Sequence, residues 1–182
     1  MVSSGSTMTE VIVERVRKRY HWPSIQLNLW ILIMLVASST ILGVFANFIA
    51  VQEQLRLGIP WYFPYWVTVG ALGIIFILVM LWLISKRQLL PGIVILGSFI
   101  LFVLWMVGLI VTSIELWGPT GSVNANCNLL QSSRGPSQET LAYLQQRSIC
   151  QSWQAAWAFE LVGTIFLFWM IVMAYQVYRE DA

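Results

Sequence analysis

The sequence predicts an all-α fold, a transmembrane four-helix bundle with a disulfide-bridged outer loop between its third and fourth helices. Hydrophobic residues make up 58% of the 182 residues and charged residues only 10%, and the mean hydropathy is +0.75. A water-soluble domain needs roughly a quarter of its residues charged. The charges lie in short clusters between four long, nearly uncharged runs. Each run has the roughly 20 residues that a helix needs to cross a hydrocarbon core about 30 Å thick.

The four apolar runs define the expected spans. We expect the transmembrane domain to occupy residues 25–178, with spans at 25–50, 62–84, 89–117 and 153–178. The first run follows Pro23, which suits a helix start, and meets no charge before Glu53. Lys86 marks the end of the second run. Pro91 falls in the first turn of the third, where its missing N–H breaks no hydrogen bond. Glu160 is the one interior charge of the fourth.

Basic residues predict the orientation, because Lys and Arg are retained in cytoplasmic segments more readily than they are translocated. Seven of the ten fall on one predicted side: Arg15, Arg17, Lys18, Arg19, Lys86, Arg87 and Arg179. We therefore expect the basic segment 1–24 and the tail 179–182 to lie in the cytosol. The membrane is expected to be the plasma membrane or one of the secretory pathway. The first six of these residues are expected to face anionic lipid. Aromatic residues are expected at the inner interface (Trp22, Tyr175 and Tyr178) and at the outer one (Trp61, Tyr62, Trp117 and Trp153).

The predicted outer loop, residues 118–152, holds both cysteines of the chain. On the predicted topology Cys127 and Cys150 face an oxidising compartment and most simply form one disulfide. A redox-active pair usually has a Cys-x-x-Cys spacing or a second cysteine couple, and this chain has neither, so we favour a structural bridge. The loop is also expected to contain a short separate helix with Leu141 and Leu144 on one face.

Polar groups inside the spans are the candidates for a site, because ionisable residues in hydrocarbon are costly and tend to face the bundle interior. Glu115 lies in the last turn of the third span and Glu160 about two turns into the fourth. The two can be neighbours that bind a proton or a cation. We favour the alternative, in which Glu115 extends toward the outer surface and Glu160 benefits from the positive end of its helix. Asn47 is expected to form an interhelical hydrogen bond rather than to bind a ligand.

Small residues recur on three spans, where they allow helices to approach closely. They are Ser39 and Gly43 in the first span, Gly70, Ala71 and Gly73 in the second, and Ala155, Ala156, Ala158 and Gly163 in the fourth. These positions can serve packing within the bundle or contacts with another copy. We favour packing within the bundle.

The sequence does not predict an enzyme. His21 is the only histidine, there is no glycine-rich phosphate loop, and no nucleophile has an evident base partner. We therefore expect no metal, no cofactor and no nucleic acid. The expected partners are membrane lipids together with a membrane-protein partner or further copies of the chain.

Two stretches resemble the fungal MARVEL-domain proteins of the non-classical-export type. They are the run from Gly43 to Phe48 and the run from Cys150 to Phe159, in which a cysteine precedes a Gln-Ala-Ala stretch. The resemblance covers all four spans in order and implies a non-enzymatic role in organising membrane domains or traffic. The alternatives are an auxiliary subunit of a larger membrane enzyme or transporter complex, and a small proton- or cation-coupled transporter using Glu115 and Glu160.

Overall fold

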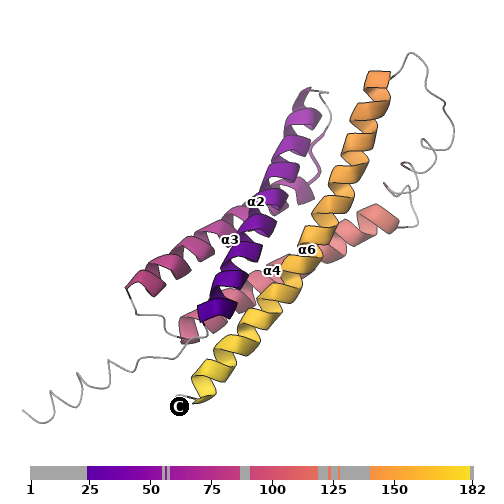
Figure 1. Ribbon diagram of the computed structural model, residues 1–182. Helices are drawn as coiled ribbons and strands as arrows, with labels where there is room; N and C mark the ends of the chain where they lie inside the picture. The colour runs from indigo at the N-terminus through magenta and orange to yellow at the C-terminus, as the bar shows by residue number, and fades with distance from the viewer. Residues whose placement is uncertain are drawn as a thin grey trace, which may run out of the picture.

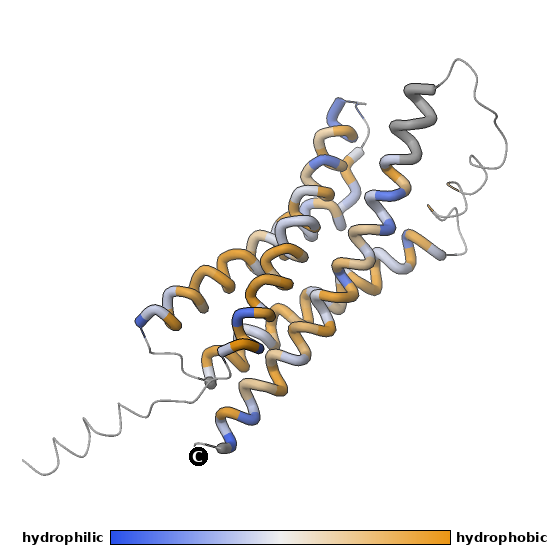
Figure 2. Tube along the Cα trace, in the orientation of Figure 1, coloured by the Kyte–Doolittle hydropathy of each residue, from blue (hydrophilic) through white to orange (hydrophobic). Residues whose placement is uncertain are grey.

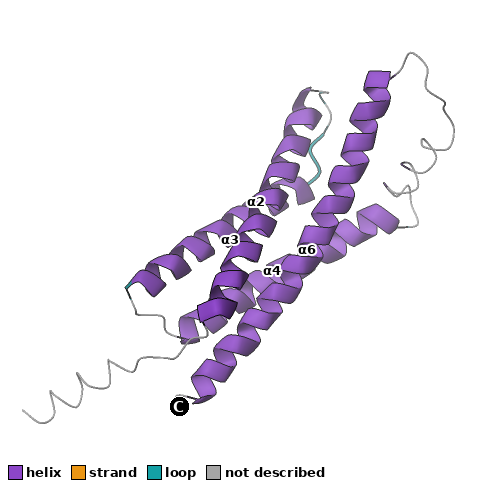
Figure 3. Cartoon of the chain, in the orientation of Figure 1, coloured by secondary structure: helices purple, strands orange, loops and turns teal. Residues whose placement is uncertain are grey.

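The predicted all-α fold is confirmed by a computed structural model, which describes residues 24–54, 56, 58–86, 91–118, 123, 127 and 140–180. These residues form four long helices and no strand (Figure 1, Figure 3). The helices are α2 (Ser24–Gln54), α3 (Tyr62–Ser85), α4 (Pro91–Trp117) and α6 (Thr140–Glu180).

Each of the four helices is long and apolar enough to cross a membrane. The qualifying stretches are Ser24–Gln54, Tyr62–Ser85, Gly92–Trp117 and Ser148–Arg179. Figure 2 shows apolar residues along the middle of the helices and most hydrophilic residues toward their ends. The chain is therefore an integral membrane protein.

The fourth helix differs from its prediction. It begins at Thr140 and runs without interruption to Glu180. The predicted separate helix is therefore the first part of α6, although the side chains of Leu141 and Leu144 lie outside the described residues. The reason is local, because no proline or glycine occurs between Thr140 and Gly163, and this stretch is rich in Leu, Ala and Gln, which favour helix. The helix continues beyond the apolar stretch as a polar extension.

The helices form a closed ring of neighbours. α2 packs against α3 and α6, and α4 packs against α3 and α6, with the α3–α4 contact the least extensive. Aromatic donors tie neighbouring helices together. The indole Nε1 of Trp30 on α2 donates to the carbonyl of Phe166 on α6 at 2.7 Å, and the hydroxyl of Tyr65 on α3 donates to the carbonyl of Leu104 on α4 at 2.7 Å.

The buried residues follow a seven-residue repeat, in steps of three and four, on each helix. On α4 they are Val94, Ser98, Leu101, Trp105, Gly108, Thr112 and Leu116. On α6 the repeat positions are Trp153, Ala156, Glu160, Gly163, Leu167, Met170, Ala174 and Val177, and Thr164 and Met173 are buried beside them. This period of 3.5 residues is that of left-handed bundles with knobs-into-holes packing. Because the spans are apolar on all sides, the repeat is visible in the burial pattern rather than in hydrophobicity.

Large rings packed on glycines hold the core together. Trp66 of α3 lies against Gly108 of α4, and Trp105 of α4 lies against Gly163 of α6. A Cβ atom on either glycine would overlap the neighbouring indole. The prediction that Gly163 serves packing within the bundle is thus confirmed, as it is for the two buried glycines of α3.

The small residues of α2 behave differently. Ser39 and Gly43 are exposed, and within the described ranges no atom outside the local backbone lies within 4 Å of a Cβ placed on Gly43. The hydroxyl of Ser39 donates to the carbonyls of Leu35 and Val36 in its own helix. Our preferred prediction, packing within the bundle, is therefore wrong for these two positions, and Ala155 and Ala158 of α6 are likewise exposed.

Candidate functional site

The candidate site is centred on Glu160, whose side chain is 0% exposed in the core of the bundle. Its place in the seven-residue repeat of α6 directs it inward, one turn before Gly163. A buried ionised carboxylate costs several kcal/mol unless it is paired and hydrogen-bonded. The partners of Glu160 therefore decide what this part of the core can do.

A chain of hydrogen bonds connects Glu160 to two other helices. The indole Nε1 of Trp66 on α3 donates to Thr112 Oγ1 on α4 at 3.0 Å, and Thr112 Oγ1 donates to Glu160 Oε1 at 3.2 Å. The direction follows from the groups, because an indole N–H can only donate and a hydroxyl has one proton to give. Both bonds are buried, so they join α3, α4 and α6 without competition from solvent.

Near these two hydrogen bonds, two buried polar atoms have no hydrogen-bond partner among the residues that the structure describes. They are Glu160 Oε2 and the indole Nε1 of Trp105, which is also 0% exposed. The Trp105 ring packs edge-on against Trp66, with 5.7 Å between ring centroids, and against Gly163. Trp105 therefore belongs to the same cluster as Glu160. We call Glu160, Thr112, Trp66 and Trp105 the glutamate cluster.

Aromatic rings cover the glutamate cluster on the side of the disulfide. Phe48 stacks on Trp153 with ring centroids 5.4 Å apart, and Phe45 stacks on Trp66 at 5.8 Å. Phe63 contacts Trp153 at 6.0 Å. Trp153 is 6% exposed and lies in the core, so its predicted place in the outer interface belt is wrong, although Trp61 and Trp117 are exposed as expected. These rings separate Glu160 from the end of the bundle that carries the disulfide.

Glu115 lies outside this cluster. It is half-buried near the C-terminal end of α4, one turn beyond Thr112, and it lies near Tyr62 of α3. Glu160 instead bonds to Thr112. The structure therefore does not join the two glutamates in one hydrogen-bonded site. Among the residues described, no group of three or more His, Cys, Asp or Glu side chains is arranged to hold a metal ion.

Asn47 faces away from the bundle. It is exposed on α2, between the buried rings of Phe45 and Phe48, which occupy the core positions of the repeat. An interhelical hydrogen bond within the described bundle therefore does not fit the position of Asn47, and one to a helix of another molecule stays a prediction. An amide on the lipid-facing side of a span lacks partners unless another helix, a lipid headgroup or interfacial water supplies them.

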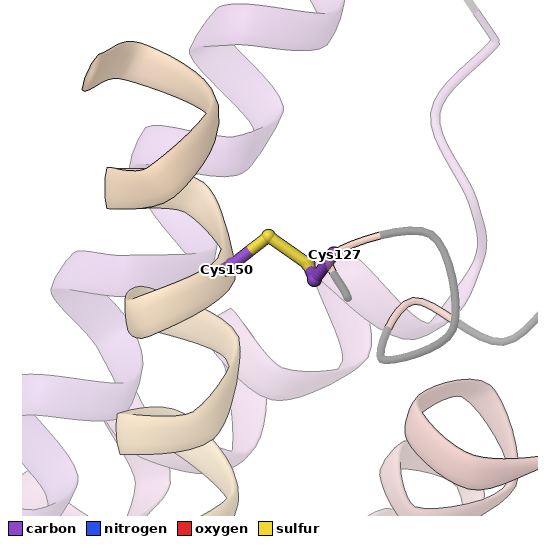
Figure 4. Close-up of a disulfide and its surroundings, with 2 residues drawn as sticks. All are labelled: Cys127 and Cys150. Carbon is purple, nitrogen blue, oxygen red and sulfur yellow. A yellow bond between two sulfur atoms is a disulfide. The ribbon is translucent and has the colours of Figure 1, made fainter. Parts of the chain in front are cut away.

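The predicted disulfide is confirmed. Cys127, in the segment between α4 and α6, is bonded to Cys150 on α6, with 6.1 Å between Cα atoms (Figure 4). The bridge attaches that segment to α6 one turn before Trp153. Closing a loop of this length stabilises the folded state by about 3 kcal/mol in the chain-entropy model.

The basic residues predicted to face lipid are described only in part. Lys86 is exposed at the end of α3. Arg15, Arg17, Lys18, Arg19 and Arg87 lie outside the described residues. Their contact with anionic lipid stays a prediction.

Sequence reasoning found Glu160 but missed its three partners. Trp66, Trp105 and Thr112 are individually ordinary in apolar helices. The available signal was spacing, because Thr112 follows Trp105 by seven residues, with Gly108 between them, which places all three on one face. The chain matches no protein-family model, no curated protein and no solved structure.

Proposed function

We propose that this protein is a non-enzymatic membrane organiser of the kind implied by the MARVEL resemblance, acting through lipid and helix–helix contacts. We place it in the plasma membrane or the secretory pathway with both termini in the cytosol. The main support for this proposal is that the polar side chains of the glutamate cluster are buried whereas the outward faces of the helices are apolar. The glutamate cluster is sealed inside, and the outward faces of all four helices carry large apolar side chains such as Leu78, Ile110 and Phe168. This arrangement supports contact with lipid and with other helices, and it does not support catalysis on a bound substrate.

Asn47 supports the helix–helix part of the proposal. Its amide lies on the outward side of α2, a little more than one turn from Gly43, where no side chain prevents close approach. Interhelical hydrogen bonds of polar side chains in membranes contribute about 0.6–2 kcal/mol each. A neighbouring helix of another molecule would satisfy the amide.

Cross-linking in native membranes tests this proposal. Because both native cysteines are in the disulfide, N47C introduces one free thiol, and I110C is a matched control on the exposed face of α4. We expect mild oxidation or a short bifunctional maleimide to join N47C to a second copy or to one stoichiometric partner, and to leave I110C monomeric. A cross-link to a copy of the chain supports the organiser, and a large stoichiometric partner supports the auxiliary subunit. Equal behaviour of the two variants contradicts a contact at Asn47.

Transport is the second candidate, and burial of Glu160 in the bundle is the observation that favours it. Intramembrane carboxyl groups often lie on proton or ion pathways. Against it, the aromatic rings described above cover the outer side of this residue. Proteoliposomes decide between the two. We expect proton and sodium fluxes equal to those of empty vesicles, whereas a flux that E160Q or E115Q abolishes, or whose pH dependence either variant changes, would establish transport.

A further inference from the structure

Glu160 lies far from the start of its helix. The sequence predicts that the positive end of the fourth helix stabilises a charge on this residue, but α6 begins at Thr140, roughly 5.5 turns before Glu160. The favourable effect of a helix end on a negative charge falls off within the first turn. That prediction is therefore wrong, and an ionised carboxylate at position 160 would need another source of stabilisation.

The four helices offer Glu160 no positive charge. α2, α3 and α4 contain no Lys, Arg or His, and Lys86 follows the far end of α3. The basic residues of α6 are Arg147 and Arg179, and both are roughly 20 Å or more along the helix from Glu160. The other titratable side chains of the four helices are acids or phenols: Glu53 on α2, Tyr62 and Tyr65 on α3, Glu115 on α4, and Tyr143, Tyr175, Tyr178 and Glu180 on α6. An ion pair within the bundle therefore does not stabilise a charge on Glu160.

The hydrogen bonding of Glu160 is that of a neutral carboxyl group. Among the described residues its one donor is the Thr112 hydroxyl, 3.2 Å from Oε1, and Oε2 has no partner. Hydroxyl donors typically lie about 2.5–2.7 Å from an ionised carboxylate, which has roughly four acceptor positions to fill. The side chain is 0% exposed, so bulk water does not supply the missing donors. Burial under these conditions costs far more for the ionised form than for the neutral one.

We propose that Glu160 is a proton-binding site, a neutral carboxylic acid at neutral pH with its proton on Oε2 while Oε1 accepts from Thr112. The hydrogen bonds from Trp66 through Thr112 then end on an uncharged group, and the core of the bundle carries no net charge. Full burial separates this proton from bulk water. The inference does not depend on the proposed membrane-organising function, because a carboxyl group can hold a proton whether or not it passes the proton on.

Infrared spectroscopy of the full chain in vesicles of ether-linked lipid tests the proposal. The C=O stretch of a protonated carboxyl group is separate from the carboxylate and amide bands, and such lipids have no ester carbonyl to obscure it. Isotopic labelling of the Glu Cδ carbon identifies the band by its shift. At neutral pH we expect a protonated Glu band that E160Q removes completely and that E115Q leaves unchanged. Acidification below about pH 4, where exposed carboxyl groups take up protons, provides the positive control.

Thr112 provides a second test that leaves Glu160 in place. A hydrogen bond to a carbonyl oxygen lowers its stretching frequency, so T112V should move the band to higher frequency without removing it. T68V, which removes an exposed hydroxyl bonded within its own helix, should not move the band. Unchanged helical amide bands show that a variant is folded, and T112V decides if E160Q is not. Absence of the band in the wild-type chain at neutral pH, its persistence in folded E160Q, its loss in E115Q or an unmoved band in folded T112V would overturn the proposal.

Discussion

Trp105 of α4 lies so close to Gly163 of α6 that a Cβ atom on residue 163 would overlap the indole ring. The ring is fully buried and is held on its other side by Trp66, so it has little room to retreat. Interiors packed at this density resist added volume. The α4–α6 contact, and the position of Glu160 one turn away, therefore depend on the missing side chain at Gly163.

Adding a methyl group at this contact should weaken the bundle. We expect G163A to lower the free energy of unfolding by about 1–3 kcal/mol, because the ring or the helix must shift to admit the methyl group. Reversible unfolding in mixed micelles measures the change. G43A is the matched control, since its exposed site is open and alanine favours helix by up to about 1 kcal/mol over glycine. An equal loss in both variants would contradict the packing described here.

Thr112, which links Trp66 to Glu160 by two buried hydrogen bonds, should also contribute to the stability of the bundle. In T112V the shape is nearly kept, but the indole N–H of Trp66 loses its acceptor and Glu160 Oε1 loses its donor. Each buried group left without a partner costs about 1–3 kcal/mol. Thr68 provides the control, because it is exposed and its hydroxyl donates to the carbonyl of Pro64 in its own helix. If T112V lowers the free energy of unfolding no more than T68V does in the same assay, the hydrogen bonds from Trp66 through Thr112 to Glu160 do not stabilise the bundle.

Glu160 itself should tolerate an amide better than truncation. E160Q keeps an oxygen that accepts from Thr112 and removes any need to bury a charge, so we expect unfolding stability equal to or above that of the wild-type chain. E160A leaves a cavity and removes the acceptor, with an expected loss of about 2–4 kcal/mol. E115Q, at the half-buried outer position, should change stability little. A larger loss in E160Q than in E160A would show that the ionised carboxylate is required.

Span length, charge placement and cysteine position were enough to predict four membrane helices and the disulfide, because each is fixed by local chemistry or by bilayer thickness. These features did not predict whether a polar residue inside a span faces the core of the bundle or the outside. Asn47 and Glu160 both interrupt apolar runs, yet Asn47 faces outward and Glu160 lies at the centre of the core. On a helix that is apolar all round, hydrophobic periodicity does not separate the two faces.

The start of α6 was missed for a different reason. Hydropathy marks where a helix can leave the membrane, and by that criterion the polar residues before Trp153 belong to a loop. Helix formation depends instead on backbone propensity, and nothing between Thr140 and Trp153 breaks a helix. The disulfide consequently joins Cys127, between α4 and α6, to a residue that lies within α6.

The disulfide also gives the sharpest test of orientation. The excess of basic residues on one side predicts that Cys127 and Cys150 lie outside the cytosol. In intact cells, a membrane-impermeant phosphine followed by an impermeant maleimide should label both cysteines, and the C127S/C150S variant should stay unlabelled. In that cysteine-free background, K86C should react only after permeabilisation, because Lys86 ends α3 on the opposite side. The reverse pattern would place the disulfide in a reducing compartment, where such bridges rarely persist, and would remove the basis for cytosolic termini.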